Sequence, residues 1–363
     1  MDYPNGLLIN YLASSLGGIS LALYSDSVHH IKYDLNIEPI NDIYLFPEPF
    51  SQVGGLRNML KIKAILQKIF KKYDIIIVQM PSIGIWSHFF TRSKKTVIYH
   101  VCANVISAAN NSIKYNGVQG LIARNYARVI SAIQQYLFKK GNNSVIVNGK
   151  ELGVLYSQCN PLVVTSSSIN QEDINTQLSS SNTKELIFVG RPAIEKGIDL
   201  IVRLINELDE KGYSLTVVGA SQKEFSEVLE RYDIELTVSI GKIRFFSYMS
   251  WSKGLKDLYR NKSALLIPSR GVEGTPRVII EAMSQGCPVI ASDIGGNAET
   301  IKSYHNGILI QNGNYVDLLN GVKRLYNSKT LREKIIRNGL ITARINTIRE
   351  FGDTFIKAIK QYE

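Results

Sequence analysis

The stretch Ala264–Glu299 reads ALLIPSRGVEGTPRVIIEAMSQGCPVIASDIGGNAE, and it decides the fold. Its apolar start, Ala264–Pro268, predicts a buried strand that ends in a Pro-Ser turn. A helix is expected from Pro276, because the first helical turn does not need the N–H that proline lacks. This helix is expected to run to about Gln285 and to stop at Gly286, since glycine commonly follows a helix end.

A second strand and a second turn follow this helix. Pro288–Ser292 is apolar and predicts a strand, and Gly295-Gly296 predicts a loop that runs to Glu299. The order strand, loop, helix, strand, glycine loop is that of a Rossmann-type unit, in which ligands bind at the carboxyl ends of the strands. The sequence therefore predicts an α/β fold with a ligand site at these loops.

Two glutamates flank the start of the predicted helix. Glu273 lies in the loop before the helix, and Glu281 lies inside it, eight positions later. The helix N-terminus between them suits a phosphate group, because its free N–H groups point at the ligand. Carboxylates beside an anion site suit hydroxyl groups instead. The pattern therefore indicates a ligand that combines phosphate with a polyol, such as a nucleotide sugar.

The letters E-G-T-P-R-V-I-I-E-A-M-S-Q-G-C-P-V-I-A-S, followed by Gly-Gly-x-x-Glu, resemble the signature of family-4 retaining glycosyltransferases with an E-x7-E motif. The resemblance implies the GT-B fold, an α/β architecture of two Rossmann-like domains facing a cleft. It also implies that Glu281 binds the ribose hydroxyls and Glu273 a hydroxyl of the donor sugar, with Gly274, Thr275 and Pro276 lining the same pocket. The alternative is an ordinary βαβ unit with surface glutamates.

A second stretch resembles another landmark of the same family. It begins at Glu185 and reads ELIFVGRPAIEKGIDLIVRLINEL. A strand is expected to end at Gly190, and Arg191 and Lys196 follow in the loop before a helix. Two cations at such a loop can clamp a diphosphate, arginine through its planar fork and lysine as a point charge. The resemblance implies this role, and two exposed basic residues without a role are the alternative.

The first part of the chain alternates strands and helices, which predicts a parallel sheet. A helix at Asn5–Leu16 opens it, so the first strand of the family's domain is apparently missing. His100 follows the strand Thr96–Tyr99, and the resemblance implies that it contacts the donor sugar, the alternative being a loop histidine without a role. Further strands are expected at Ile19–Tyr24, Asp42–Phe46, Ile75–Gln79, Ser144–Val147 and Leu162–Thr165, with a long amphipathic helix over Gly117–Phe138.

The domain plan rests on one polar stretch. Ser166–Lys184 is rich in Ser, Asn and Gln and predicts a linker at 167–184 between an acceptor-side domain, 1–166, and a nucleotide-sugar domain, 185–347. A last helix at 348–363 is expected to cross back to the first domain. In the second domain, further strands are predicted at Leu215–Gly219 and within Glu235–Lys242.

Charge and composition limit the classes of partner that the chain can have. The net charge is +11, and residues 1–165 carry 16 Lys+Arg against 8 Asp+Glu. Five lysines between Lys61 and Lys72 punctuate an apolar helix pattern, which predicts either contact with an anionic membrane or a solvated face on a core helix. No nucleic-acid-binding module is recognisable. No apolar run reaches the ~20 residues of a membrane span, and the start lacks a basic signal region, so we expect a cytoplasmic protein, peripheral at the membrane face.

The predicted activity is transfer of a hexose from a nucleotide-sugar donor to a glycan or lipid-linked acceptor, with retention of configuration. No cofactor and no metal are expected, because no pair of histidines has metal-ligand spacing, no Asp-x-Asp element occurs, and the three cysteines form no metal pattern. Two alternatives stay open. One is a nucleotide-sugar epimerase or hydrolase on the same scaffold, and the other is an inactive nucleotide-sugar-binding subunit.

Overall fold

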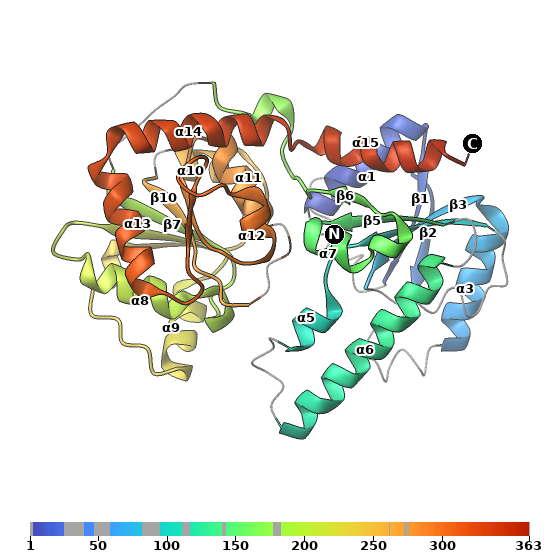
Figure 1. Ribbon diagram of the computed structural model, residues 1–363, viewed down its shortest axis with the longest axis horizontal. Coiled ribbons are helices and arrows are strands. Elements are labelled where there is room, and N and C mark those ends of the chain that lie inside the picture. The colour runs from blue at the N-terminus through green and yellow to red at the C-terminus, as the bar shows by residue number, and fades with distance from the viewer. Residues whose placement is uncertain are drawn as a thin grey trace. The chain divides into compact units, whose positions relative to one another are not determined.

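The computed structural model describes residues 3–24, 40–46, 59–81, 95–110, 117–139, 143–176, 183–260, 262–271, 274 and 276–362. Its internal contacts divide the chain into two compact units (Figure 1). The first unit comprises Met1–Ser166 together with Ile348–Glu363, and the second comprises Ser167–Thr347. Both units are α/β with parallel sheets, as a GT-B fold of two Rossmann-like domains requires.

The first unit contains two parallel sheets, a pair β1-β2 and a four-stranded sheet in the order β3-β4-β5-β6. Its strands are β1 (Ile19–Tyr24), β2 (Ile40–Phe46), β3 (Ile75–Met80), β4 (Thr96–Val101), β5 (Asn143–Asn148) and β6 (Leu162–Val164). Its helices are α1 (Tyr3–Leu16), α3 (Met59–Lys72), α5 (Val105–Asn110), α6 (Gly117–Lys139), α7 (Lys150–Leu155) and α15 (Ile348–Lys360).

Alternate residues of the central strands face two different helical layers. In β4, Val97 and Tyr99 pack into a core with α3, α6 and α7. Ile98 points to the other face, where it packs with residues of α1 and α15. Because both faces are covered, these strands are apolar almost throughout. The last helix of the chain therefore completes the core of the first unit, beside α1 (Figure 1).

The second unit is built on one parallel sheet in the order β12-β11-β10-β7-β8-β9. Its strands are β7 (Glu185–Val189), β8 (Ser214–Val218), β9 (Ile243–Phe246), β10 (Ala264–Ile267), β11 (Val289–Ser292) and β12 (Ile308–Ile310). Its helices are α8 (Ile198–Glu207), α9 (Gln222–Arg231), α10 (Lys253–Arg260), α11 (Arg277–Ser284), α12 (Gly295–Thr300), α13 (Tyr315–Asn327) and α14 (Lys329–Arg344). In Figure 1, α8, α9 and α13 cover one face of the sheet and α10, α11 and α14 the other.

Two predictions about the second unit are wrong. The strand expected within Glu235–Lys242 is absent from these residues, and β9 begins only at Ile243, which pairs with Leu215. The side chain of Asn206 explains this, because it accepts from Thr237 N at 3.0 Å and donates to Glu235 O at 2.8 Å, as a sheet neighbour would. The loop expected from Gly295 is instead the short helix α12.

The segment predicted as a linker is bonded to the second unit over residues 167–176. The Asp173 carboxylate accepts from Trp251 Nε1 at 2.9 Å and forms an ion pair with Lys256. Asn175 N donates to Ser284 O at 2.8 Å. The polar residues of this segment therefore form hydrogen bonds with the region of α10 and α11, and they do not indicate a solvated linker. The remainder of the predicted linker, 177–182, lies outside the described residues.

No helix within the described ranges combines the length and apolar character that crossing a bilayer needs.

Candidate nucleotide-sugar site

The connections of the second sheet reverse direction between β7 and β10. From β7 the chain proceeds outward to β8 and β9, and from β10 it proceeds the other way to β11 and β12. Neighbouring loops therefore diverge to opposite faces at the carboxyl ends of β7 and β10. This is the topological switch point at which open α/β sheets bind ligands. The loops on either side are 190–197 and 268–276.

These two loops are held against each other by backbone contacts. Glu195 O accepts from Arg270 N at 2.9 Å and from Gly271 N at 3.3 Å. Gly197 has φ +74°, and a Cβ at this position would lie 2.1 Å from Pro268 O. Only glycine tolerates both this conformation and this approach. The glycine after Lys196 is therefore required to bring the β7–α8 loop to the end of β10.

The β7–α8 loop carries the predicted diphosphate clamp. Arg191 follows Gly190, and its side chain is 63% exposed. Its Nη2 lies 2.5 Å from Glu195 Oε1, an ion pair that the sequence reasoning missed although its i,i+4 spacing is a usable signal. Lys196 closes the short 3-10 helix Ile194–Lys196 in the same loop. The loop therefore offers two cations and one carboxylate that partly neutralises them.

A third cation at this edge was also missed. Arg270 follows β10 by three residues and forms an ion pair with Asp199 at the start of α8. Asn312 Nδ2 donates to Arg270 O at 3.3 Å, so the loop after β12 supports the same residue. The positive charge of the edge therefore comes from both loops at the switch point. No sequence motif marked Arg270, and only the topology brings it here.

The β10–α11 loop is described in part. Glu273 and Thr275 lie outside the described residues, whereas Gly274 is exposed and Pro276 is the residue preceding α11. The helix was expected to start at Pro276, and it begins one residue later. It ends at Ser284, with Gly286 at φ +74° just past its end, as predicted. The first N–H groups of α11 therefore lie at the carboxyl edge of β10, where an anion would meet them.

Glu281 lies on the buried side of α11. Its carboxylate accepts from Ser168 Oγ and, at 3.4 Å, from Tyr259 Oη. Burial first, and then the Glu281 carboxylate, raise the pKa of Tyr259 well above its usual range, so this hydroxyl stays a donor. Sequence reasoning missed both partners, because Ser168 was assigned to a linker and Tyr259 was not singled out. These donors hold Glu281 in one orientation.

His100 belongs to the first unit and is 5% exposed. It lies near the carboxyl end of β4, and its Nε2 is 3.0 Å from Asn148 Oδ1 at the end of β5. The ring of Phe355 packs edge-on against it, with centroids 5.0 Å apart. The thiol of Cys102 lies 3.6 Å from Nδ1. The polar neighbours Asn148 and Cys102 were not singled out from the sequence.

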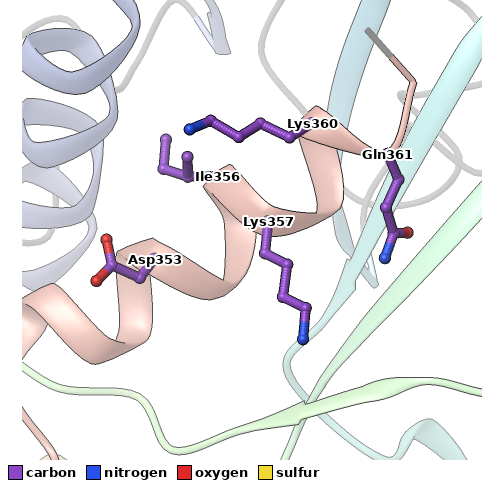
Figure 2. A pocket seen from close by; sticks show the side chains of 5 residues that line it. All are labelled: Asp353, Ile356, Lys357, Lys360 and Gln361. Carbon is purple, nitrogen blue, oxygen red and sulfur yellow. The ribbon is translucent and has the colours of Figure 1, made fainter.

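The described part of the chain contains a hollow that lies away from the predicted donor residues. No group of three or more His, Cys, Asp or Glu side chains there is arranged to hold a metal ion. A hollow of about 460 Å³ lies along α15 (Figure 2). Its lining comes from that helix and the residue after it, namely Asp353, Ile356, Lys357, Lys360 and Gln361. It contains none of the predicted donor residues.

Comparison with known proteins supports the assignment of the second unit. Residues 169–341 match the family described as "Glycosyl transferases group 1". An uncharacterized glycosyltransferase of Methanocaldococcus jannaschii is 31% identical over 188 residues, which are 51% of this chain and 47% of that protein. The capsular polysaccharide biosynthesis glycosyltransferase CapM of Staphylococcus aureus is 24% identical over 152 residues, 42% of this chain and 39% of CapM. The chain thus aligns with less than half the length of either relative.

A solved structure shares the fold across both units. The crystal structure of Anabaena HepE in complex with UDP-glucose superimposes with a TM-score of 0.72, covers 99% of this chain and 96% of HepE, and is 16% identical. This likeness confirms the GT-B architecture expected from the sequence. Residues 169–341 of this chain are therefore similar to the family of group 1 glycosyl transferases.

Proposed function

We propose that the protein transfers a hexose from a nucleoside diphosphate sugar to a saccharide acceptor, with the donor bound at the switch point of the second sheet. The observation that carries this proposal is the convergence of Arg191, Lys196 and Arg270 on two bonded loops at the carboxyl ends of β7 and β10. A diphosphate carries the negative charge that such an edge attracts. UDP-glucose, the ligand of HepE, is the first donor to test.

In the proposed reaction, the bond between the anomeric carbon and the diphosphate oxygen breaks while an acceptor hydroxyl oxygen attacks that carbon, and the hydroxyl proton passes to an oxygen of the leaving diphosphate. Negative charge then grows on the leaving diphosphate. Arg191, Lys196 and the N–H groups at the start of α11 would stabilise it, and fixed donors of this kind are worth ~10²–10³ in rate each. Attack on the face from which the diphosphate leaves would retain configuration without a protein nucleophile. These cations would supply the charge that a divalent metal supplies elsewhere.

The roles of the remaining residues follow the family resemblance. Glu281 would accept hydrogen bonds from the ribose hydroxyls, and Glu273 one from the donor sugar. Gly190, Gly274, Thr275 and Pro276 would line the pocket with backbone groups. By the same resemblance, His100 would contact the donor sugar. The acceptor would be a glycan or a lipid-linked saccharide of a polysaccharide pathway, as the name of the relative CapM suggests.

Calorimetric titration with a panel of nucleotides and nucleotide sugars tests the proposal. Arg191→Ala should weaken donor binding about tenfold or more, because a charge-assisted contact to phosphate is lost. Arg231→Ala, which removes an exposed arginine at the end of α9, is the matched control and should bind like the wild type. Retained binding in Arg191→Ala, or no binding of any nucleotide sugar by the folded wild type, would contradict the proposed donor site.

Turnover separates the two alternatives that the sequence left open. Donor consumed without acceptor, or isomerised, would indicate a hydrolase or epimerase. Donor bound but not consumed with any saccharide acceptor would indicate an inactive subunit. The proposal expects donor consumption that depends on an added acceptor.

A further inference from the structure

Helix α6 presents apolar side chains on two opposite faces. Its inner face contributes Ile130, Leu137 and Phe138 to the core of the first unit. Its outer face carries six large apolar or aromatic residues that are exposed, which we call the outer stripe. The outer stripe consists of Val118 (74% exposed), Leu121 (55%), Ile122 (63%), Tyr126 (39%), Val129 (56%) and Tyr136 (56%).

The outer stripe is continuous along the helix. Ile122, Val129 and Tyr136 are seven residues apart, so they lie along one side of α6. The apolar residues of α6 are thus divided between the core of the first unit and the outer stripe. A lone exposed apolar residue is ordinary, but a row of this length on one helix indicates an interaction surface.

The stretch of sequence that contains α6 is basic. Between Asp74 and Glu151 the sequence contains no Asp or Glu and nine Lys or Arg. On α6 itself, Arg124 and Arg128 follow Leu121 by three and seven residues, so they border the stripe. The surface therefore combines exposed apolar groups with positive charge, which complements an anionic lipid surface.

The other basic helix of the first unit lacks this combination. Apart from Leu60, which is 81% exposed, the apolar side of α3 is buried in the core, with Ile62, Leu66 and Phe70 each at most 5% exposed. Its lysines face solvent, and Lys72 pairs with Asp42 at 2.7 Å. The sequence left open whether this helix binds a membrane or is a solvated face. The structure favours the solvated face, because α3 has little apolar surface to insert.

We propose that α6 docks the protein on an anionic phospholipid surface, with the outer stripe inserted at the interface and Arg124 and Arg128 on the headgroup phosphates. A second copy of the chain is the less suitable occupant, because two α6 helices would each bring three cations and no carboxylate together. This docking surface lies in the first unit. It does not depend on the proposed donor site in the second.

Vesicle co-sedimentation tests the proposal with two pairs of matched variants of the full chain. Ile122→Ser with Val129→Ser removes exposed apolar area from the stripe, and its control replaces two exposed apolar residues of the second unit, Val316→Ser with Ile345→Ser. Arg124→Gln with Arg128→Gln removes two charges, and Lys68→Gln with Lys71→Gln removes two from α3. Vesicles contain phosphatidylcholine alone or with about a third phosphatidylglycerol.

The wild type and both controls should bind the anionic vesicles at least about tenfold more tightly than the neutral ones, and less tightly as salt rises. Each α6 variant should lose about tenfold or more of this binding while melting like the wild type. Wild-type failure to bind anionic vesicles, equal binding by the α6 variants, or loss confined to the α3 variant would overturn the proposal. The proposal would also be overturned if the wild type were a dimer in sedimentation velocity and the variant Ile122→Ser with Val129→Ser were a monomer.

Discussion

At the scale of single residues, the ion pair between Arg191 and Glu195 sets how much positive charge the donor loop offers. The pair is largely exposed, and such pairs are worth about 0.2–1 kcal/mol. Glu195→Gln removes the competitor for the guanidinium while leaving its size, so it should tighten binding of a nucleoside diphosphate about twofold to fivefold. Titration calorimetry measures this, and weaker binding by Glu195→Gln would show that the carboxylate orients Arg191 instead of competing for it.

A second residue-scale prediction concerns Cys287, whose thiol is buried beside β10. Burial raises its pKa to about 12 from an ordinary value near 9. The unfolded chain therefore loses this proton at lower pH than the folded chain, and stability falls as pH rises from about 9 toward 12. Cys287→Ala should remove about 1 kcal/mol of the stability difference between pH 8 and pH 10, because one pKa unit corresponds to about 1.4 kcal/mol.

Guanidinium denaturation of both proteins at the two pH values gives the comparison. Buried tyrosines contribute equally to the change of stability with pH in both proteins. The difference between wild type and Cys287→Ala in this change therefore isolates the thiol. If stability changed equally between the two pH values in both proteins, Cys287 would not be protected from titration in the folded protein.

At the scale of elements, Gly197 joins the β7–α8 loop to the end of β10. Alanine there must adopt a positive φ and meet Pro268 O, whereas Gly212 has nearly the same φ of +72° and nothing within 4 Å of an added Cβ. Gly212→Ala should cost about 1 kcal/mol from conformation alone. Gly197→Ala should cost at least about 1 kcal/mol more, because overpacking adds to strain. Equal losses in chemical denaturation would show that the two loops do not need this close approach.

The elements also show where the sequence sufficed. The unit β10–α11–β11 was predictable because proline, glycine and apolar runs mark each of its boundaries locally. The strand expected within Glu235–Lys242 was not, because the side chain of Asn206, about thirty residues earlier, occupies its backbone groups. At the site, Arg191 and Lys196 were identifiable from their loop. Arg270 and Ser168 were not identifiable. Only the fold brings Arg270 to Asp199 at the start of α8 and Ser168 to Glu281.

At the scale of the whole molecule, the chain's last helix completes the first unit. Phe355 is fully buried on α15 and packs with Leu12 of α1 and with Ile98 and Ile146 of the four-stranded sheet. Phe355→Ala should therefore lower the stability of the first unit by about 3–5 kcal/mol. The strand β4, in which Ile98 lies, reports on the folding of this unit through the exchange of its backbone N–H groups.

Hydrogen exchange of β4, followed as denaturant is raised, should show a lower midpoint for Phe355→Ala. Ile341→Ala, at a half-exposed position of α14, is the control and should leave that midpoint in place. An unchanged midpoint in Phe355→Ala would contradict the packing of α15 into the core of the first unit.

Hydrogen–deuterium exchange with and without UDP-glucose tests the location of the donor site most directly. Binding at the switch point should slow exchange in the β7–α8 loop at 190–197 and in the first turn of α11, because their N–H groups contact the diphosphate or lose access to water. The same segments should show no slowing in Arg191→Ala at equal ligand concentration. Protection confined to other parts of the chain would contradict a donor site between β7 and β10.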